Sequence, residues 1–258
     1  MSDRRVALVT AGASGIGRVT AECLARAGIA VHICDSDESA IEGCLAANTE
    51  MTASRTDVSN VEQVDAMFAD LARHHQRLDV LVNNAGISGP TAAVEDIDPA
   101  DWDRTIAVDL SSAFYVTRRA VPLLRTTRGS IVNIASNAAL FGVPLRSPYA
   151  ASKWALIGLT KTWAMELGPA GVRVNAICPG SVQGARIDGV IERDAMQRGM
   201  APEAIRNVYL RQSSMRTFAE AEDIAAMVLY LCSDAGRNIS GQSIAIDGHT
   251  ETLSNWLD

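Results

Sequence analysis

Short apolar and β-branched runs alternate along the chain with longer amphipathic stretches. The run Arg5–Thr10 is typical of a buried strand, whereas residues 60–75 place their apolar side chains at helical spacing. This pattern predicts strands at Arg5–Thr10, Ala30–Cys34, Met51–Thr56, Leu78–Val82, Gly129–Ala135, Val172–Cys178 and Gln242–Ile246. It predicts helices at Ile16–Ala27, Asp37–Ala47, Asn60–His75, Asp101–Arg125 (long enough to bend), Pro148–Leu167 and Ala221–Cys232.

The alternation of strands and helices determines the expected architecture. Helices between successive strands act as crossover connections, which join parallel strands and cover both faces of a sheet. No linker or repeat divides the chain, so we expect one α/β domain over residues 1–258 with a doubly wound parallel sheet. The segment 179–217 is the irregular part. It follows a strand end, where open α/β sheets bind ligands, so residues 184–216 are predicted to form a substrate lid.

Composition and charge exclude several classes of protein. The 258 residues are 48% hydrophobic and carry a formal net charge of −7, which argues against a nucleic acid or an anionic membrane as partner. No apolar stretch reaches the ~18–20 residues of a spanning helix, and the N-terminus lacks the apolar core of a signal peptide. We therefore expect a cytoplasmic protein. The five cysteines contain no C-x-x-C and the four histidines no H-E-x-x-H, so free thiols and no metal site are predicted.

The first strand leads into a glycine-rich turn and then a helix. Glycines at such a turn let the backbone approach a pyrophosphate, and the helix N-terminus supplies free N–H groups and the positive end of its dipole. Because the turn opens the first strand–helix–strand unit, it fits the dinucleotide fingerprint. The residues expected to bind the cofactor here are Ala11, Gly12, Ser14, Gly15, Ile16 and Gly17.

The second strand ends in Asp35, 18 residues after Gly17. A carboxylate there can accept hydrogen bonds from both hydroxyls of the adenosine ribose, and it would repel the 2′-phosphate of NADP. Ser14 and Ser36 occupy the positions where a compensating Arg or Lys is expected. The sequence therefore predicts NAD rather than NADP. The alternative role for Asp35 is to cap the following helix.

Tyr149 and Lys153 lie four residues apart, on one face of a predicted helix. Hydride transfer from an alcohol requires a base for the hydroxyl proton, and a free tyrosine has a pKa of about 10. Lowering that pKa by about three units requires roughly 4 kcal/mol of preferential stabilisation of the tyrosinate. The charge of Lys153 and of an oxidised nicotinamide can supply it. The alternative interpretation is an ordinary surface pair.

Together, the glycine turn and the Tyr–Lys pair resemble those of the short-chain dehydrogenase/reductase family over essentially the whole chain. Thr10, Gly15 and Gly17 fit its T-G-x-x-x-G-x-G turn, but Ala11 holds the first glycine position. One methyl group is tolerable there if the backbone at position 11 is not left-handed. The resemblance implies a Rossmann-like fold and a nicotinamide cofactor.

The same resemblance supplies further site residues. It implies that Ser136, 13 residues before Tyr149, holds the substrate oxygen, and that Tyr149 and Lys153 also contact the cofactor, Lys153 at the nicotinamide ribose. Matches to the family motifs D-V, N-N-A-G and N-x-x-x-P-G-x-V add the cofactor-binding residues Asp57, Val58, Asn84, Ala85, Gly86, Pro179, Gly180 and Val182. Gly184 stands where the family often has threonine, so one hydrogen bond to the cofactor is expected to be missing or moved.

Asp109 departs from the family pattern, which has an asparagine as the fourth catalytic residue. The resemblance implies that its backbone carbonyl helps to hold a water that links Lys153 to solvent. An ionised carboxylate there would raise the pKa of Lys153 and alter the pH optimum. We therefore include Asp109 among the catalytic residues. The alternative is a local hydrogen-bonding role in the helix.

The substrate is the least defined part of the prediction. The segment 184–216 contains six arginines and four acidic residues, a net charge of +2 in an acidic chain. Arginines bind carboxylates and phosphates with two parallel hydrogen bonds, although solvated helix faces and subunit contacts are the alternative. Asn137, Arg146 and Arg186 are the predicted substrate contacts. With 5% aromatic residues, a small polar or anionic secondary alcohol is favoured, such as a sugar, sugar acid or hydroxy acid.

Two alternatives to an NAD-dependent alcohol dehydrogenase remain open at this point. One is a ketoacyl or ketone reductase, and the other is a non-catalytic NAD-binding regulator, which would need no tyrosine base. The resemblance also implies a homotetramer built through the long helices. The apolar tail residues Leu253, Trp256 and Leu257 favour packing at such an interface.

Overall fold

The structure is a computed structural model that describes residues 4–253. Within that range a seven-stranded sheet has the order β3-β2-β1-β4-β5-β6-β7, and every neighbouring pair is parallel. The strands are β1 (Val6–Thr10), β2 (Ala30–Asp35), β3 (Thr52–Arg55), β4 (Val80–Asn83), β5 (Ser130–Ile134), β6 (Arg173–Pro179) and β7 (Ser243–Ile246). The strand order reverses between β1 and β4, and such a reversal point opens a ligand crevice at the carboxyl ends of the strands.

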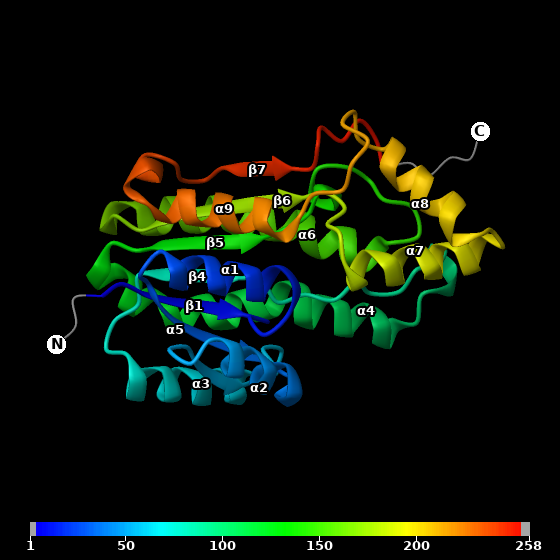
Figure 1. Cartoon of the computed structure of the whole chain (residues 1–258). Helices are drawn as coiled ribbons and strands as arrows, with labels where there is room; N and C mark the ends of the chain where they lie inside the picture. The colour runs from blue at the N-terminus through cyan, green and yellow to red at the C-terminus, as the bar shows by residue number, and fades with distance from the viewer. Residues whose placement is uncertain (1–3, 254–258) are drawn as a thin grey trace.

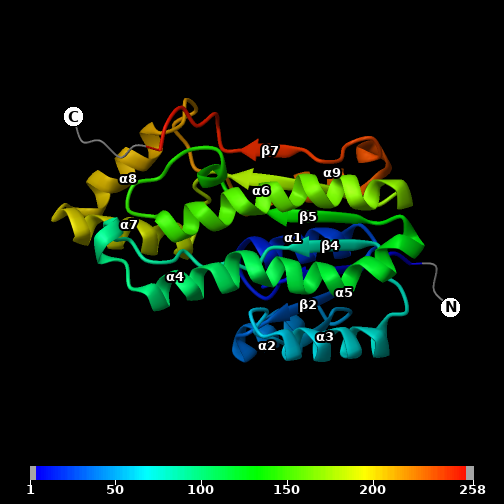
Figure 2. The same ribbon diagram turned by 180° about the vertical axis from the view of Figure 1, so that it is seen from behind.

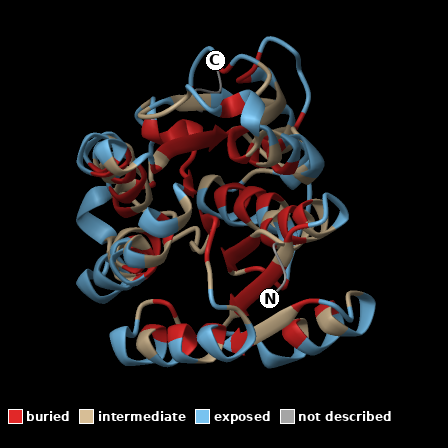
Figure 3. Ribbon diagram, turned by 90° about the vertical axis from the view of Figure 1, so that its left-hand side faces the viewer, coloured by how far each residue is buried: buried red, intermediate tan, exposed pale blue. Residues whose placement is uncertain are grey.

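Helices cover both faces of the sheet (Figures 1 and 2), as predicted. One face is covered by α1 (Gly15–Arg26), α2 (Glu38–Ala47) and α9 (Ala221–Cys232). The other face is covered by α3 (Val61–His74), α5 (Ser112–Thr127) and α6 (Ser147–Leu167). Figure 3 shows buried residues on the sheet and on the inward sides of the helices, so each face of the sheet has its own apolar core.

The long helix predicted over Asp101–Arg125 consists of three segments. Helix α4 (Pro99–Ile106) continues through a π-helical turn (Ala107–Ser111) into α5. Asp109 lies on that turn, and π turns within α-helices are frequent at functional sites.

The segment after β6 is helical, so the expectation of irregular structure is wrong. Helices α7 (Ala185–Arg198) and α8 (Pro202–Arg211) lie beyond the carboxyl ends of the strands (Figure 1). They enclose a third, smaller apolar cluster that includes Ile191, Ile205 and Phe218. The numerous charged residues between these apolar positions obscured the helical period in the sequence.

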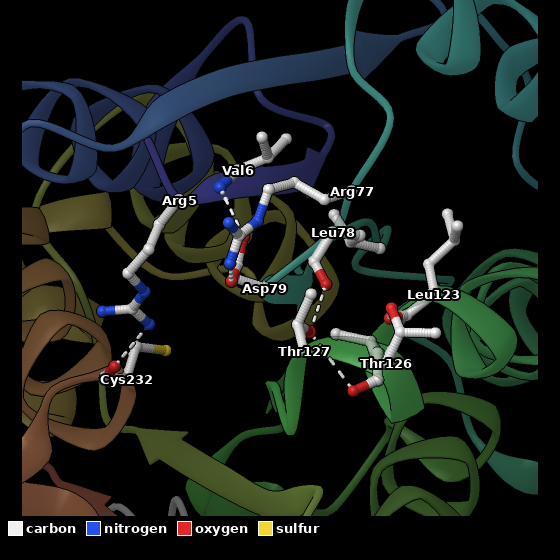
Figure 4. A network of polar contacts seen from close by, with 10 residues as sticks. Arg5, Val6, Arg77, Leu78, Asp79, Leu123, Thr126, Thr127 and Cys232 are labelled. Atoms are coloured by element: carbon white, nitrogen blue, oxygen red, sulfur yellow. Dashed lines mark hydrogen bonds and ion pairs between the residues drawn. The ribbon is translucent and has the colours of Figure 1, made fainter. Parts of the chain in front are cut away.

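The amino ends of the strands, opposite the crevice, are tied together by polar contacts (Figure 4). Asp79 is buried before β4, accepts the Val6 backbone N–H at 2.8 Å and pairs with Arg77 at 2.6 Å. Arg5 donates to the carbonyl of Cys232 at the end of α9. These contacts join β1, β4 and α9 at the end of the sheet away from the site.

Three sequence expectations outside the site can be compared with the described residues. None of the helices in residues 4–253 is long and apolar enough to cross a membrane. The cysteines are free thiols, of which Cys34, Cys44, Cys178 and Cys232 are buried. Leu253 is buried in the molecule, whereas Trp256 and Leu257 lie outside the described residues.

Candidate active site

The glycine turn lies between β1 and α1 and has no room for side chains at two positions. A Cβ atom at Gly17 would lie 2.0 Å from the Ala11 carbonyl oxygen, and one at Gly12 would lie 2.7 Å from the Ile33 side chain. Asn84, at the end of β4, donates to the carbonyls of Thr10 and Ala11 and so fixes the turn against the neighbouring strand. This tight turn at a helix N-terminus is a backbone cradle of the kind that binds a dinucleotide pyrophosphate.

The backbone at Ala11 is left-handed, contrary to the condition under which the sequence made an alanine tolerable there. Its φ is 47°, in the left-handed region, and Gly15 in the same turn has a φ of 51°. The left-handed conformation costs an alanine about 1–2 kcal/mol, which glycine avoids. The turn therefore keeps the shape that a glycine would favour, with backbone strain at Ala11.

Asp35 accepts hydrogen bonds through both carboxylate oxygens at the end of β2. They accept backbone N–H groups of Ala13 and Asp37, each at 3.2 Å. The cap of α2 is Asp37, whose side chain accepts the Ala40 N–H, so the alternative role for Asp35 is not what the structure shows. The carboxylate lies at the end of β2, facing the glycine turn.

The predicted adenine contacts differ in their surroundings. Asp57 accepts the backbone N–H and the hydroxyl of Ser59 and pairs with Arg104 at 3.3 Å. Its neighbour Val58 is buried in the apolar core beside α3. Both residues lie outside the lining of the cavity described below.

Ser136, Tyr149 and Lys153 come together at the carboxyl end of β5. Ser136 lies two residues after the end of that strand and caps a short 3-10 helix, and Tyr149 and Lys153 lie one turn apart on α6. The Lys153 ammonium nitrogen is buried, donates to the Ile134 carbonyl at 3.1 Å and lies 5.7 Å from the Tyr149 ring centroid. The lysine is thus held in place beside the tyrosine.

The electrostatic environment favours ionisation of Tyr149. Burial alone would raise its pKa, but the charges of Arg186 and Lys153 and a hydrogen bond with Ser136 outweigh that effect and lower the pKa. The charge of Asp109 instead raises the pKa of Tyr149. Arg186, from helix α7, contributes more to this lowering than Lys153 of the Tyr–Lys motif.

Asp109 is buried beside Lys153. Its Oδ1 accepts the Ile87 backbone N–H at 2.7 Å, and its Oδ2 is buried without a hydrogen-bond partner among the described residues. A Cβ at Gly86 would lie 3.3 Å from both the Asp109 carboxylate and the Lys153 ammonium group, so Gly86 adjoins both side chains. Burial raises the pKa of Asp109, although Lys153 counteracts this.

One cavity of about 530 Å³ gathers most of the predicted site residues. Its lining contains Ala11, Ser14, Gly15, Ile16, Asn84, Gly86, Ser136, Asn137, Arg146, Tyr149, Lys153, Pro179, Gly180, Val182 and Arg186. The predicted residues outside this lining are Gly12, Gly17, Asp35, Asp57, Val58, Ala85 and Asp109. Sequence reasoning did not assign the cavity residues Val143, Ile187, Val190, Tyr209, Gln212 and Leu253. The helical spacing of Ile187 and Val190 was an available signal, whereas nothing local marked Leu253.

Gly184, which replaces the family's threonine, has a φ of 134° at the start of α7. That conformation is essentially limited to glycine, so the chain enters the lid by a route that a threonine would resist.

Known proteins similar to this chain agree with the geometry. Residues 10–249 match a family model described as enoyl-(acyl carrier protein) reductase. A trans-4-hydroxycyclohexanecarboxylate dehydrogenase from Sinomonas cyclohexanicum is 38% identical, over 100% of this chain and 97% of the relative. A 3β-hydroxysteroid dehydrogenase from Mediterraneibacter gnavus is 35% identical, over 95% of this chain and 94% of the relative. The crystal structure of an NAD⁺-bound xylitol dehydrogenase has a TM-score of 0.90 at 30% identity, covering 95% and 98% of the two chains.

The chain belongs to the short-chain dehydrogenase/reductase family. It is an oxidoreductase that acts on CH–OH groups, and it has the Rossmann-like parallel sheet that the sequence predicted. The alternative of a non-catalytic regulator is not supported, because the named relatives are dehydrogenases.

Proposed function

We propose that this protein is a single-domain, NAD-dependent dehydrogenase that oxidises a small polar secondary alcohol to a ketone, with Tyr149 as the base. The observation that carries the proposal is the meeting of two features in one cavity. The glycine turn supplies a dinucleotide cradle, and Tyr149, with its lowered pKa, lies in the same cavity beside Ser136 and Lys153.

Each catalytic residue has a role that follows from its position. Bound NAD would accept the hydride from the carbinol carbon. Tyr149 removes the hydroxyl proton, because neighbouring positive charges favour its ionised form. The hydroxyl of Ser136 hydrogen-bonds the substrate oxygen and shares its developing charge. Lys153 is held by the Ile134 carbonyl beside Tyr149, where it would also bind the nicotinamide ribose of the cofactor.

The preference for NAD rests on Asp35. Its two oxygens are oriented by the Ala13 and Asp37 N–H groups, which leaves remaining lone pairs for the ribose hydroxyls. Arg55 lies on the adjacent strand but pairs with Glu38 at 3.4 Å, so its charge is compensated. An equal or higher kcat/KM with NADP would contradict this role for Asp35.

The central experiment is a screen of NAD reduction over sugars, sugar acids and hydroxy acids, with Tyr149→Phe as a matched variant. The substitution removes the proton-accepting oxygen and little else, so turnover should fall by about 10²–10⁴-fold or more while NAD binding persists. Turnover of every responsive alcohol at the wild-type rate by this variant would refute the catalytic assignment. The reverse reaction with the corresponding ketone tests the reductase direction in the same assay.

We further propose a homotetramer that uses the outer faces of α5 and α6. Phe114 on α5 and Trp154 on α6 are 47% and 52% exposed, and a groove between these helices is lined by Leu110, Tyr115 and Leu159 among others. Apolar side chains gathered on one face are typical of subunit contacts. A monomeric mass in light scattering at assay concentration would contradict the assembly.

A further inference from the structure

Three arginines from different parts of the chain converge beside Tyr149, on the short segment 86–88. Arg186 of α7 donates to the Gly86 carbonyl at 3.0 Å. Arg146, at the start of α6, donates to the Ser88 carbonyl at 2.7 Å, and Arg193 of α7 donates to the Ser88 hydroxyl at 2.9 Å. Three like charges that repel one another are thus gathered at one side of the catalytic cavity.

Arg146 differs from the other two arginines in having a buried nitrogen that lacks a hydrogen-bond acceptor among the described residues. It is 8% exposed, and its Nε is buried without a hydrogen-bond partner among the described residues. Its guanidinium carbon lies 4.8 Å from the ring centroid of Tyr149, and the residue lines the cavity. A buried charged donor without an acceptor is unfavourable, so this nitrogen requires an explanation, and a bound acceptor in the cavity would supply one.

The nearby acidic groups balance only part of these charges. Asp109 interacts with Lys153, Arg186 and Arg146, but it is one carboxyl against several cationic groups, and burial raises its pKa. Within the lid, Asp188 pairs with Arg206 and Asp194 with Arg198. The described residues that line the cavity include Arg146, Lys153 and Arg186 but no aspartate or glutamate. The start of the 21-residue helix α6 adds the positive end of its dipole at the same place. The field at this side of the cavity therefore selects an anion.

We propose that this cavity binds the carboxylate of a hydroxy acid, with Arg146 as the direct ligand and Arg186 and Arg193 as neighbouring charges. The proposal rests on the dehydrogenase function proposed above and specifies its substrate class. Because the Arg146 guanidinium lies against the Tyr149 ring, the carboxylate and the reacting carbinol are separated by few carbon atoms. The fitting substrates are short-chain or single-ring hydroxy acids.

The kinetic test compares each acid with its neutral amide, for example 3-hydroxybutyrate with 3-hydroxybutanamide and 4-hydroxycyclohexanecarboxylate with its carboxamide. Wild-type enzyme should prefer the acid by about 100-fold in kcat/KM, the order expected for a buried charge pair. Arg146→Gln should reduce this ratio to near one, chiefly through the KM for the acid. Arg211→Gln is the matched control, because Arg211 is an exposed arginine of the same segment whose side chain donates to the Asn207 carbonyl of its own helix and which does not line the cavity among the described residues. The Arg211→Gln variant should keep the wild-type ratio of kcat/KM for acid and amide.

A binding measurement separates this inference from the catalytic assignment. Calorimetry with cyclohexanecarboxylate and cyclohexanecarboxamide, in the presence of NAD, needs no turnover. If the wild-type protein binds the carboxylate selectively and Arg146→Gln abolishes that binding, the anion site is supported even when no tested alcohol is oxidised. A failure to oxidise any alcohol would contradict the dehydrogenase proposal alone. If circular dichroism shows that Arg146→Gln does not fold, Arg193→Gln, at an exposed position, should still weaken carboxylate binding.

Two outcomes would overturn the anion site. One is efficient oxidation of acid and amide with equal kcat/KM by the wild-type enzyme, which leaves the dehydrogenase function intact. The other is an Arg146→Gln variant whose KM rises for NAD while its acid-to-amide ratio is unchanged. That result would assign the arginine to the phosphates of the cofactor instead of the substrate.

Discussion

His32 lies on β2 with its ring buried between two hydroxyl groups of the adjacent strand β3. Its Nδ1 is 2.7 Å from the Thr52 hydroxyl, and its Nε2 is 2.9 Å from the Ser54 hydroxyl. Ser54 donates its proton to Asp70, so it must accept from His32, which places the imidazole proton on Nε2. The Thr52 hydroxyl that contacts Nδ1 also lies 3.2 Å from Nε2 of His75. A charged imidazolium would lose its hydration at this buried position, so the folded protein favours a neutral His32.

Acidification should therefore destabilise the protein. Burial lowers the pKa of His32 from 6.5 to about 4. Because the unfolded chain binds the proton at higher pH than the folded one, the stabilisation is complete above pH 6.5 and is lost as the pH falls toward 4. The difference corresponds to about 3 kcal/mol in full, of which about 2 kcal/mol is lost between about pH 7.5 and pH 5.

Urea denaturation followed by circular dichroism across that range measures the loss. His32→Gln is the comparison, since an amide can donate to Ser54 but does not titrate, and its free energy of unfolding should vary much less with pH. The carboxyl of Asp70 has a pKa lowered by its bond from Ser54, so its own contribution is lost at lower pH, below 3.8. Parallel slopes for wild type and His32→Gln between pH 7.5 and 5 would refute the reasoning.

Three further substitutions test the site. Ala11→Gly relieves the left-handed backbone and should stabilise the protein by about 0.5–1 kcal/mol, the relieved strain less the extra chain entropy of glycine; an unchanged denaturation midpoint would contradict it. Asp109→Asn keeps an acceptor for the Ile87 N–H but removes a buried carboxyl of raised pKa, so the stability of the variant relative to wild type should increase as the pH rises above 3.8. Because Asp109 raises the pKa of Tyr149, the midpoint of the pH–rate profile should move to lower pH in the same variant. Arg186→Gln removes the largest charge effect that lowers the pKa of Tyr149, so the same midpoint should move to higher pH, and a fixed midpoint would exclude that role.

The parts of the site that could be predicted from the sequence are those that the local spacing of residues determines. Tyr149 and Lys153 meet because residues four apart share a helix face, and the glycine turn is set by the strand and helix that flank it. The conformation of Ala11 was not accessible in this way, because it depends on how Asn84 and Gly17 fix the turn in three dimensions. The lid helices were missed because charged residues obscure their apolar period.

The effect of Arg186 on the pKa of Tyr149 shows how a local motif depends on a distant part of the chain. The Tyr–Lys motif is local, but the charge that most lowers the pKa of Tyr149 comes from the lid, 37 residues further along the chain. The same arginine bonds the Gly86 carbonyl, which adjoins both Lys153 and Asp109. Without the charge of Arg186 the pKa of Tyr149 would be higher, so the strength of this base depends on a residue that lies outside the Tyr–Lys motif.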